Sequence, residues 1–363
     1  MSSSPATPLE SSAQTALDIE RLAIPELTLV SGAAGWVGRA LVERLLASRP
    51  EGRLRILVRS LDDVSEFGWS SGGRLEVVAG DITVVADVER FFNGAVGADV
   101  IHAAGVIHPE SVAGFYAVNT EGVKNIVTAA RRTGVRRLVH VSSNSPFGTN
   151  PTHDDVFRND EPYRPYFNYG ISKMQGELAV LDAVRGDHLD AVIVRPPWFY
   201  GPFQPARQTV FFTMIKKGRF PVIGSGEQRR SMVFIENLVD GIIAAELTSG
   251  IAGRGYWIAD ATPYSINEIV STVARALSDE GYPAAAKSMK VPAIVGKVAE
   301  CADGLLQRSG RYNQQIHVLG EMDKTIACDI SAARRELGYD PQVSLYDGMR
   351  TSIQWCRQNG IEL

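Results

Sequence analysis

The feature of this sequence that most limits its fold is a short β-branched run that leads through three spaced glycines into an amphipathic stretch. The run covers residues 27–31, and the glycines are Gly32, Gly35 and Gly38. Glycines between a strand and a helix let the backbone approach an anion, because a helix N-terminus carries unpaired N–H groups and a partial positive charge. The spacing therefore predicts a phosphate-binding turn, which also contains Trp36 and Val37. A plain tight turn is the alternative.

The alternation of a short buried run and a longer helical stretch continues along the first half of the chain. The runs expected as strands cover residues 27–31, 54–59, 75–80, 99–104, 137–143 and 190–195. Amphipathic stretches lie between them, and one of these ends at Gly134, a residue typical of helix C-termini. Strands and helices that alternate in this way form a parallel sheet covered on both faces. We therefore expect an α/β fold with a doubly wound parallel sheet.

The pattern changes after Arg195. The Pro- and aromatic-rich segment RPPWFYGPFQP and the residues that follow it, up to 230, sustain neither the helical nor the strand period. Residues 235–247 then predict a helix and residues 255–260 a further buried strand. The chain is therefore expected to leave the sheet for a second lobe and to return.

These changes predict how the chain is divided. We expect a dinucleotide-binding Rossmann domain of residues 25–195 plus about 232–262. The smaller, discontinuous C-terminal substrate lobe would comprise about 196–231 plus 263–363. Residues 1–24 are rich in Ser, Ala and Pro and are expected to form a disordered extension.

The composition of the 363 residues excludes several classes of function. A net charge of −4 gives no global basic surface for nucleic acid, and no apolar run is long enough to span a membrane. The N-terminus lacks the basic and apolar regions of a secretory signal, so a cytoplasmic protein is expected. Three cysteines without C-x-x-C spacing predict neither a disulfide framework nor a metal site. A small-molecule substrate is the expected partner.

Residues after the second, third and fourth strands are candidate cofactor contacts. Arg59 stands where an NAD-binding protein usually has an acidic residue, and an arginine there suits the 2′-phosphate of NADP. NADP is therefore slightly favoured over NAD, with a solvated strand-end arginine as the alternative. Asp81 is expected to accept a hydrogen bond from adenine, or only to cap its strand. The other expected contacts are Ile82, Ala103, Ala104 and Gly105, whereas His102 is expected to be structural.

Candidate catalytic groups follow the fifth strand. Ser143 ends this strand, and Tyr169 and Lys173 have the i, i+4 spacing that places both on one face of a helix. A nearby ammonium lowers the pKa of a phenol, so Tyr169 is expected to exchange a proton with an alcohol or carbonyl near neutral pH. Ser143 would hydrogen-bond the same substrate oxygen, with Asn144 as a further substrate contact.

In their order these motifs resemble those of the extended short-chain dehydrogenase/reductase family, the NAD-dependent epimerase/dehydratases, from residue 27 to residue 360. The resemblance implies an NAD(P)-dependent enzyme in which Ser143, Tyr169 and Lys173 are catalytic. It implies that Asn119 supports a proton relay or the helix geometry. It also implies that Pro196 and Trp198 belong to a segment that covers the nicotinamide.

The family contains several chemistries, and departures from its subgroups narrow the choice. Asn144 and Ser145 stand where 4,6-dehydratases carry an Asp-Glu pair and where decarboxylases carry a glutamate, so both reactions are disfavoured. Arg229 and Arg230 lie in a segment that resembles the diphosphate-gripping segment of sugar-nucleotide enzymes, although two arginines can also simply solvate a loop. We expect hydride transfer to or from a ring hydroxyl or keto carbon of a nucleotide-activated sugar, by an epimerase or a 4-ketoreductase.

Two other functions stay open. The C-terminal part also resembles 3β-hydroxysteroid dehydrogenases, which bury an apolar substrate in the second lobe. The amphipathic stretch 291–306 could form such an apolar wall, or an ordinary lobe helix. A catalytically silent NAD(P)-binding regulator is the third possibility. Relatives in the family also imply a homodimer through the helices that contain VNTEGVKN and YGISK.

Overall fold

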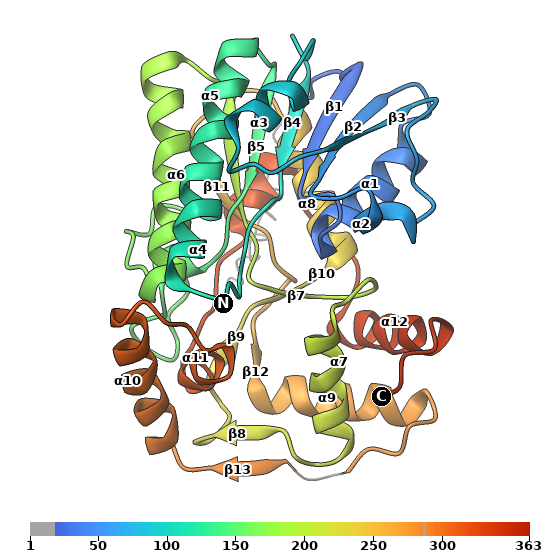
Figure 1. The fold of residues 1–363 in the computed structure, drawn as a ribbon. Coiled ribbons are helices and arrows are strands. Elements are labelled where there is room, and N and C mark those ends of the chain that lie inside the picture. Colours follow the sequence, from blue (N-terminus) through green and yellow to red (C-terminus); the bar gives the residue numbers. More distant parts are fainter. Residues whose placement is uncertain (1–18, 286–287) are drawn as a thin grey trace, which may run out of the picture.

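The computed structural model describes residues 19–285 and 288–363, and its upper layer is built on one parallel sheet (Figure 1). The sheet has seven strands in the order β11-β6-β5-β4-β1-β2-β3, and every neighbouring pair is parallel. The doubly wound α/β fold is therefore confirmed. The strands are β1 (Leu27–Ser31), β2 (Arg53–Val58), β3 (Leu75–Ala79), β4 (Asp99–His102), β5 (Arg137–Val141), β6 (Ala191–Arg195) and β11 (Gly255–Trp257).

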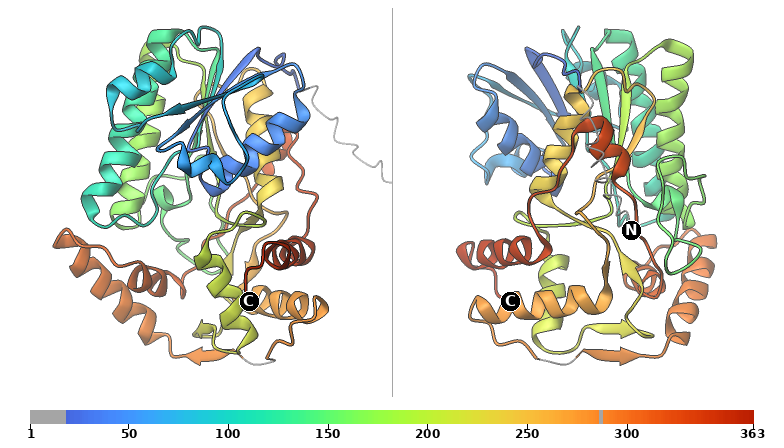
Figure 2. Two further views of the ribbon diagram at one scale, coloured as in Figure 1. Left: turned by 45° about the vertical axis from the view of Figure 1, so that its right-hand side comes forward. Right: turned by 180° about the vertical axis from the view of Figure 1, so that it is seen from behind.

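Helices cover both faces of this sheet (Figure 2). Successive residues of a strand point to opposite faces, so Val30 of β1 belongs to one apolar core and Leu29 to the other. The first core includes Leu41 and Leu238, which belong to the helices on one face of the sheet. The second core includes Ile126, which belongs to the helices on the other face. The two groups are α1 (Trp36–Ser48) with α8 (Ile235–Leu247), and α3 (Val85–Phe91), α5 (Val123–Thr133) and α6 (Phe167–Asp187).

Several short elements connect the strands at the carboxyl edge of the sheet. They are α2 (Asp62–Ser65), α4 (Val112–Tyr116), a π-helical turn (Ala117–Gly122) and a 3₁₀ turn (Ser145–Phe147). In the strand order, β1 lies between β4 and β2, so the connections from β1 and β4 diverge at this edge. Parallel sheets bind their ligands at such a switch point.

The second layer lies below the sheet in Figure 1 and consists of helices with three two-stranded pairings. β7 (Trp198–Tyr200) pairs with β10 (Met232–Phe234), β8 (Pro221–Ile223) with β13 (Met289–Val291), and β9 (Arg229–Arg230) with β12 (Tyr264–Ser265). The helices are α7 (Ala206–Lys216), α9 (Ile266–Asp279), α10 (Ile294–Arg308), α11 (Gln314–Glu321) and α12 (Leu345–Gln358), with a further π-helical turn (Ala333–Leu337). The predicted boundaries between two domains stay a prediction.

The expectation of disorder before residue 25 is wrong for residues 19–24, and residues 1–18 lie outside the described residues. The amide of Leu22 donates to the carbonyl of Leu247, at the end of α8. The Arg21 guanidinium donates to the Leu337 carbonyl at 2.7 Å and to the Thr248 hydroxyl at 2.7 Å. These bonds satisfy carbonyls at the end of α8 and of the π-helical turn, which explains why a polar segment is held here.

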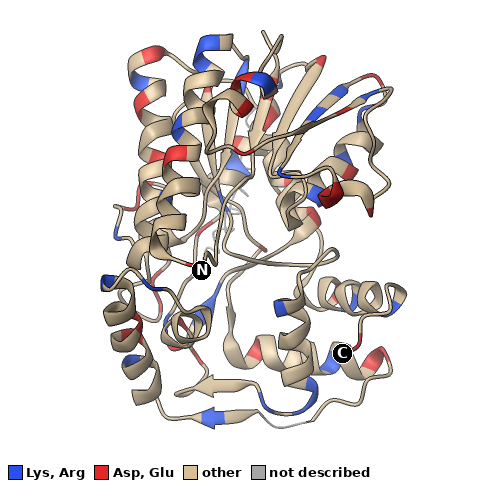
Figure 3. Ribbon diagram, viewed as in Figure 1, with Lys and Arg blue, Asp and Glu red and all other residues tan. Residues whose placement is uncertain are grey.

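Charged residues are spread over both layers (Figure 3). Among the described residues, no helix combines the length and the apolar composition needed to cross a bilayer.

Candidate active site

Two of the three glycines in the first turn are required by contacts within the protein itself. Gly32 has a left-handed φ of +77°, and a Cβ on it would lie 2.5 Å from the backbone nitrogen of Ala104. A Cβ on Gly38 would lie 2.0 Å from the Gly32 carbonyl oxygen. The turn is therefore pressed between the start of α1 and the chain after β4, and only glycine fits at both positions.

Gly35 has a different role, because it is the N-cap of α1, and its own amide donates to the Gly32 carbonyl at 3.0 Å. Its φ of −75° and ψ of 167° suit any residue, and the nearest atom to an added Cβ is 3.2 Å away. No side chain caps the helix, so the first amides of α1 stay open to a ligand. This arrangement fits the pyrophosphate of a dinucleotide.

The side chains of Trp36 and Val37 point away from this open helix end. The Trp36 indole donates to the Pro202 carbonyl at 2.6 Å and packs edge-on against Phe199 at 4.8 Å between ring centroids. Val37 is buried in the core. Both residues can therefore reach a cofactor only through their backbone amides.

The candidate cofactor contacts after β2 and β3 differ in whether their side chains are free to bind a ligand. Arg59 directly follows β2 and is exposed. One carboxylate oxygen of Asp81 accepts from the Thr83 amide at 2.8 Å, as in the capping alternative. The Ile82 side chain is buried against Gly122, so only its backbone could face a ligand.

Gly105 keeps open a space beside Asn119 and Lys173. A Cβ on Gly105 would lie 3.4 Å from Asn119 Oδ1 and 3.8 Å from Lys173 Nζ. The Asn119 amide group accepts from the Val106 amide and donates to its carbonyl, both at 2.9 Å, and also donates to Ser172 Oγ at 3.2 Å. Asn119 therefore holds the chain after β4 against α6, which matches the geometric role expected for it more closely than a relay.

The structure brings Ser143, Tyr169 and Lys173 together at the carboxyl edge of β5. Tyr169 lies in the first turn of α6, close enough to the Ser143 side chain for Ser143 to lower its pKa, and Lys173 follows one turn later. Lys173 Nζ donates to the Val141 carbonyl at 3.0 Å, and burial lowers the pKa of Lys173 to about 8. The hydroxyl of Ser145 lies 3.3 Å from that of Ser143, so no carboxylate stands next to Ser143.

The expected direction of the Tyr169 pKa is wrong. Burial raises the pKa of Tyr169, and the hydrogen bond with Ser143 opposes this rise without reversing it. The Lys173 ammonium makes no hydrogen bond with the phenol and is held by a backbone carbonyl instead. Tyr169 is therefore a neutral phenol at neutral pH in this structure.

His102 ends β4 and is fully buried inside the sheet. Its Nδ1 is 2.6 Å from Ser31 Oγ, and its ring stacks on that of His140 at 5.3 Å. Burial lowers the pKa of His102 to about 3, so the ring is neutral. These contacts agree with a structural role.

A buried ion pair beneath Lys173 was not predicted from the sequence. Glu177, one turn after Lys173 on α6, accepts from Arg195 at 2.8 Å and from the Tyr163 hydroxyl at 2.7 Å. The Arg195 guanidinium also lies over the Phe147 ring at 4.5 Å. The three partners come from separate segments, so no local motif marks them.

A cluster of rings from both layers lies near Tyr169 with one arginine of the second layer, and it was also missed. Phe115 lies 5.6 Å from the Tyr169 ring and 5.0 Å from the Tyr312 ring, and the Tyr312 hydroxyl lies 2.8 Å from His108 Nδ1. The charge of Arg207, at the start of α7, opposes the rise in the pKa of Tyr169 and adds to the lowering of the pKa of His108. Arg207 makes no hydrogen bond or ion pair with the described residues, so its guanidinium is available to a ligand.

The two candidate diphosphate ligands point to opposite sides of β9. Burial lowers the pKa of Arg230, whose side chain donates to the Glu321 carbonyl. Arg230 shares Glu321 with Tyr169, because the Glu321 charge also raises the pKa of that phenol. The Arg229 charge instead lowers the pKa of the exposed His153, on the other side of the strand. Only Arg230 therefore lies on the Tyr169 side of the lobe.

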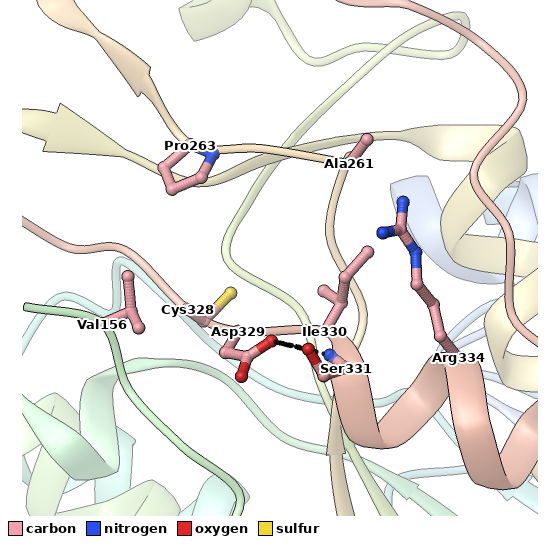
Figure 4. A pocket seen from close by; sticks show the side chains of 8 residues that line it. All are labelled: Val156, Ala261, Pro263, Cys328, Asp329, Ile330, Ser331 and Arg334. Atoms are coloured by element: carbon pink, nitrogen blue, oxygen red, sulfur yellow. Dashed lines mark hydrogen bonds between the residues drawn. The ribbon is translucent and has the colours of Figure 1, made fainter. Parts of the chain in front are cut away.

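The other predicted substrate-side residues lie at the edges of this region. Asn144 follows Ser143 and is half-buried. Pro196 is buried after β6, and Trp198 of β7 packs edge-on against Phe211 at 5.2 Å. A hollow of about 220 Å³ elsewhere in the molecule contains none of the predicted site residues, and its wall includes Cys328, Asp329 and Arg334 (Figure 4). No group of three or more His, Cys, Asp or Glu in residues 19–285 and 288–363 could hold a metal ion.

Comparison with known proteins gives matches along most of the chain. Residues 28–259 match the model of the NAD dependent epimerase/dehydratase family. The uncharacterized protein y4nL of Sinorhizobium fredii is 46% identical over 344 residues, covering 92% of this chain and 96% of y4nL. A dTDP-glucose 4,6-dehydratase of Streptomyces griseus is 29% identical over 345 residues, covering 91% and 94%. The crystal structure of DesIV, a dTDP-glucose 4,6-dehydratase from Streptomyces venezuelae with NAD and TYD bound, is similar with a TM-score of 0.71 and 25% identity, covering 92% of this chain and 97% of DesIV.

Proposed function

Because this chain belongs to the NAD-dependent epimerase/dehydratase family, we propose that it transfers a hydride to or from a ring hydroxyl or keto carbon of a nucleotide-activated sugar. The enzyme would be an epimerase or a 4-ketoreductase that uses NAD or NADP. The observation that carries this proposal is the placement of Ser143 beside the Tyr169 phenol, whose pKa it lowers against burial, with Lys173 one turn away on α6 and Arg230 in the second layer.

The residues of the first turn and of the sheet edge would hold the cofactor. The open amides at Gly35 suit the pyrophosphate, the space at Gly105 beside Lys173 suits the nicotinamide ribose, and Arg59 suits a 2′-phosphate. When bound, the nicotinamide accepts or supplies the hydride.

Tyr169 and Ser143 would handle the proton. The Tyr169 phenol is neutral at pH 7, so it is set to donate its proton to a carbonyl oxygen as that oxygen becomes an alcohol. Ser143, beside the same phenol, orients the substrate oxygen and stabilises charge that develops on it.

Dehydration stays disfavoured in this proposal, although two of the three proteins named above are 4,6-dehydratases. Loss of water from the sugar needs an acid and a base beside the catalytic hydroxyl. Here Asn144 follows Ser143, and the next side chain, Ser145, is a hydroxyl 3.3 Å from Ser143 Oγ. An amide and a hydroxyl supply neither group at neutral pH.

A second candidate is the 3β-hydroxysteroid type of dehydrogenase, which the rings of Phe115 and Tyr312 next to Tyr169 favour. These rings offer an apolar surface to a flat substrate. The apolar wall considered for residues 291–306 is absent from the inner side of α10, where the buried residues are Gly296, Ala299, Asp303 and Gln307. The sugar-nucleotide proposal is therefore the stronger one, and cytoplasmic localisation and a homodimer stay predictions.

The test of the catalytic assignment is Tyr169→Phe, assayed for oxidation of NAD(P)H with keto sugar nucleotides and for isomerisation of sugar nucleotides. We expect a loss of turnover of at least about a hundredfold with unchanged cofactor affinity, because only the transferable proton is removed. Tyr163→Phe is the matched control, because Tyr163 bonds to Glu177 and lies outside the proposed proton path. Turnover in Tyr169→Phe that equals that of the control would refute the assignment.

The substrate class has its own test, in which Arg229→Ala is the control for Arg230→Ala. Titration with UDP and dTDP should show at least about tenfold weaker binding for Arg230→Ala and little change for Arg229→Ala, because only Arg230 lies on the Tyr169 side. Equal binding by both variants and the unaltered protein would remove the sugar-nucleotide class and leave the hydroxysteroid type.

A further inference from the structure

Helix α10 is turned so that its large apolar side chains face solvent. Ile294, Val298 and Leu305 are 62%, 61% and 62% exposed, at spacings of four and seven residues that place them on one face. The exposed Cys301 lies between them on the same face. A surface helix normally buries such a stripe against the core, so the orientation needs an explanation.

The explanation is that the opposite, polar face of α10 is fixed by hydrogen bonds. The buried Asp303 carboxylate lies 2.7 Å from His317 Nδ1 of α11 and accepts from Gln307 at 2.9 Å. Gln307 in turn accepts from the backbone amide of Asn168 at 3.1 Å and from its side chain at 2.9 Å. α10 is therefore held against α11 and the start of α6, and rotation that buried the apolar stripe would break all of these bonds.

The charged side chains of α10 are also divided between its two faces. Lys297 and Arg308 are exposed and flank the apolar stripe, whereas Glu300 is turned toward Lys324, with which it pairs at 2.8 Å. On the neighbouring strand β13, Met289 is 48% exposed and is followed by the exposed Lys290. Figure 1 draws α10 and β13 along the outer edge of the second layer, away from the sheet.

We propose that this α10 face docks on an anionic lipid surface. The α10 face is defined by the exposed apolar residues and cations of this helix, Ile294, Val298, Leu305, Lys297 and Arg308. An amphipathic helix of this kind lies in the membrane interface with its apolar residues among the acyl chains and its basic residues at the headgroups. The proposal is independent of the reaction that the enzyme catalyses.

Charge complementarity favours a lipid surface over a second copy of the chain. If two α10 faces packed against each other, Lys297 and Arg308 would meet a partner face that offers cations and no exposed acid of α10. An anionic bilayer supplies the missing negative charge along the whole face.

The test is co-sedimentation of the full-length protein with vesicles of phosphatidylcholine alone and of phosphatidylcholine with phosphatidylglycerol. We expect binding to the anionic vesicles only, and at least about a tenfold loss of partitioning in Val298→Glu. Val96→Glu is the matched control, since Val96 is 79% exposed in the sheet layer and outside the α10 face. Lys297→Gln with Arg308→Gln should reduce binding to the anionic vesicles and weaken its salt dependence.

Three results would overturn the proposal. One is the absence of binding by the unaltered protein to anionic vesicles at low salt. Another is equal binding by the Val298 and Val96 variants. The third is a dimer in light scattering that Val298→Glu dissociates, which would assign the face to self-association. Because these positions are exposed, both variants should melt at the temperature of the unaltered protein, and circular dichroism checks this.

Discussion

The different roles of Gly38 and Gly35 predict that alanine at the two positions will have separable effects. An alanine Cβ at position 38 would lie 2.0 Å from the Gly32 carbonyl oxygen, a backbone atom that cannot move aside. Overpacking of this kind costs about 3 kcal/mol or more, and the better helix propensity of alanine returns about 1 kcal/mol. For a chain of 363 residues, a net loss of about 2 kcal/mol corresponds to a fall in Tm of roughly 3 °C, with cofactor affinity lost as the turn distorts.

Gly35→Ala should behave in the opposite way. The backbone at Gly35 suits alanine and the nearest atom to its Cβ is 3.2 Å away, so stability should change by less than about 1 kcal/mol. The methyl group would stand over the open amides of α1 and remove a charge-assisted hydrogen bond, which weakens cofactor binding about tenfold or more.

The measurements are thermal unfolding by circular dichroism and titration of NAD(P)H fluorescence. Gly186→Ala is the control, because it lies on α6 with nothing within 4 Å of an added Cβ, and it should keep cofactor affinity and leave Tm unchanged or slightly higher. If Gly35→Ala lowered Tm as much as Gly38→Ala, or if Gly38→Ala left Tm unchanged, the assignment of roles to the two glycines would be wrong.

The remaining predictions concern cofactor choice and pH dependence. Arg59→Ser should weaken binding of NADPH about tenfold and leave that of NADH unchanged, and equal affinities in the unaltered protein and the variant would exclude a 2′-phosphate contact. Glu177→Gln should lower Tm, because it leaves Arg195 buried without its counter-charge. It should also lower the pKa of Lys173 from about 8, since Glu177 raises it against burial, so that the fall of kcat/KM at alkaline pH begins at a lower pH. Tyr163→Phe, which keeps the carboxylate, should leave that profile in place, and a profile unmoved by Glu177→Gln would refute the coupling.

The sheet was predictable from the sequence because its strands are short, β-branched and buried on both faces. Residues 27–31 form β1 as expected, and the other predicted strands lie within three residues of those observed. Residues 235–247 form α8 with the predicted bounds. In contrast α7 was missed, because apolar residues lie all around it and no period marks one face.

The orientation of α10 could not be predicted for a related reason. Periodicity shows that a helix has an apolar and a polar face, and the usual assumption is that the apolar face is buried. Here Asp303 and Gln307 have partners on α11 and α6, so the polar face is inside. Those partners are distant in sequence and become visible only in the folded chain.

The candidate site was likewise predictable only in part from the sequence. Ser143, Tyr169 and Lys173 lie together because a strand end and one helical turn fix their positions, and the sequence contains both. The acidity of Tyr169 is also set by residues that no motif contains. After burial and the Ser143 bond, the charges that act on the phenol are Glu321 of α11, which raises its pKa, and Arg207 of α7, which lowers it.

Both of these charges belong to the second layer, so that layer has two effects on the reaction. Under the proposed function it would contact the substrate, and it also shifts the pKa of a phenol whose position the sheet and α6 determine. An anionic group of the substrate that pairs with Arg207 would cancel its effect and raise the pKa of Tyr169 further. Such a substrate would keep the phenol protonated and favour proton donation to a carbonyl. The second layer can therefore change the pH dependence of this step while Ser143, Tyr169 and Lys173 stay the same.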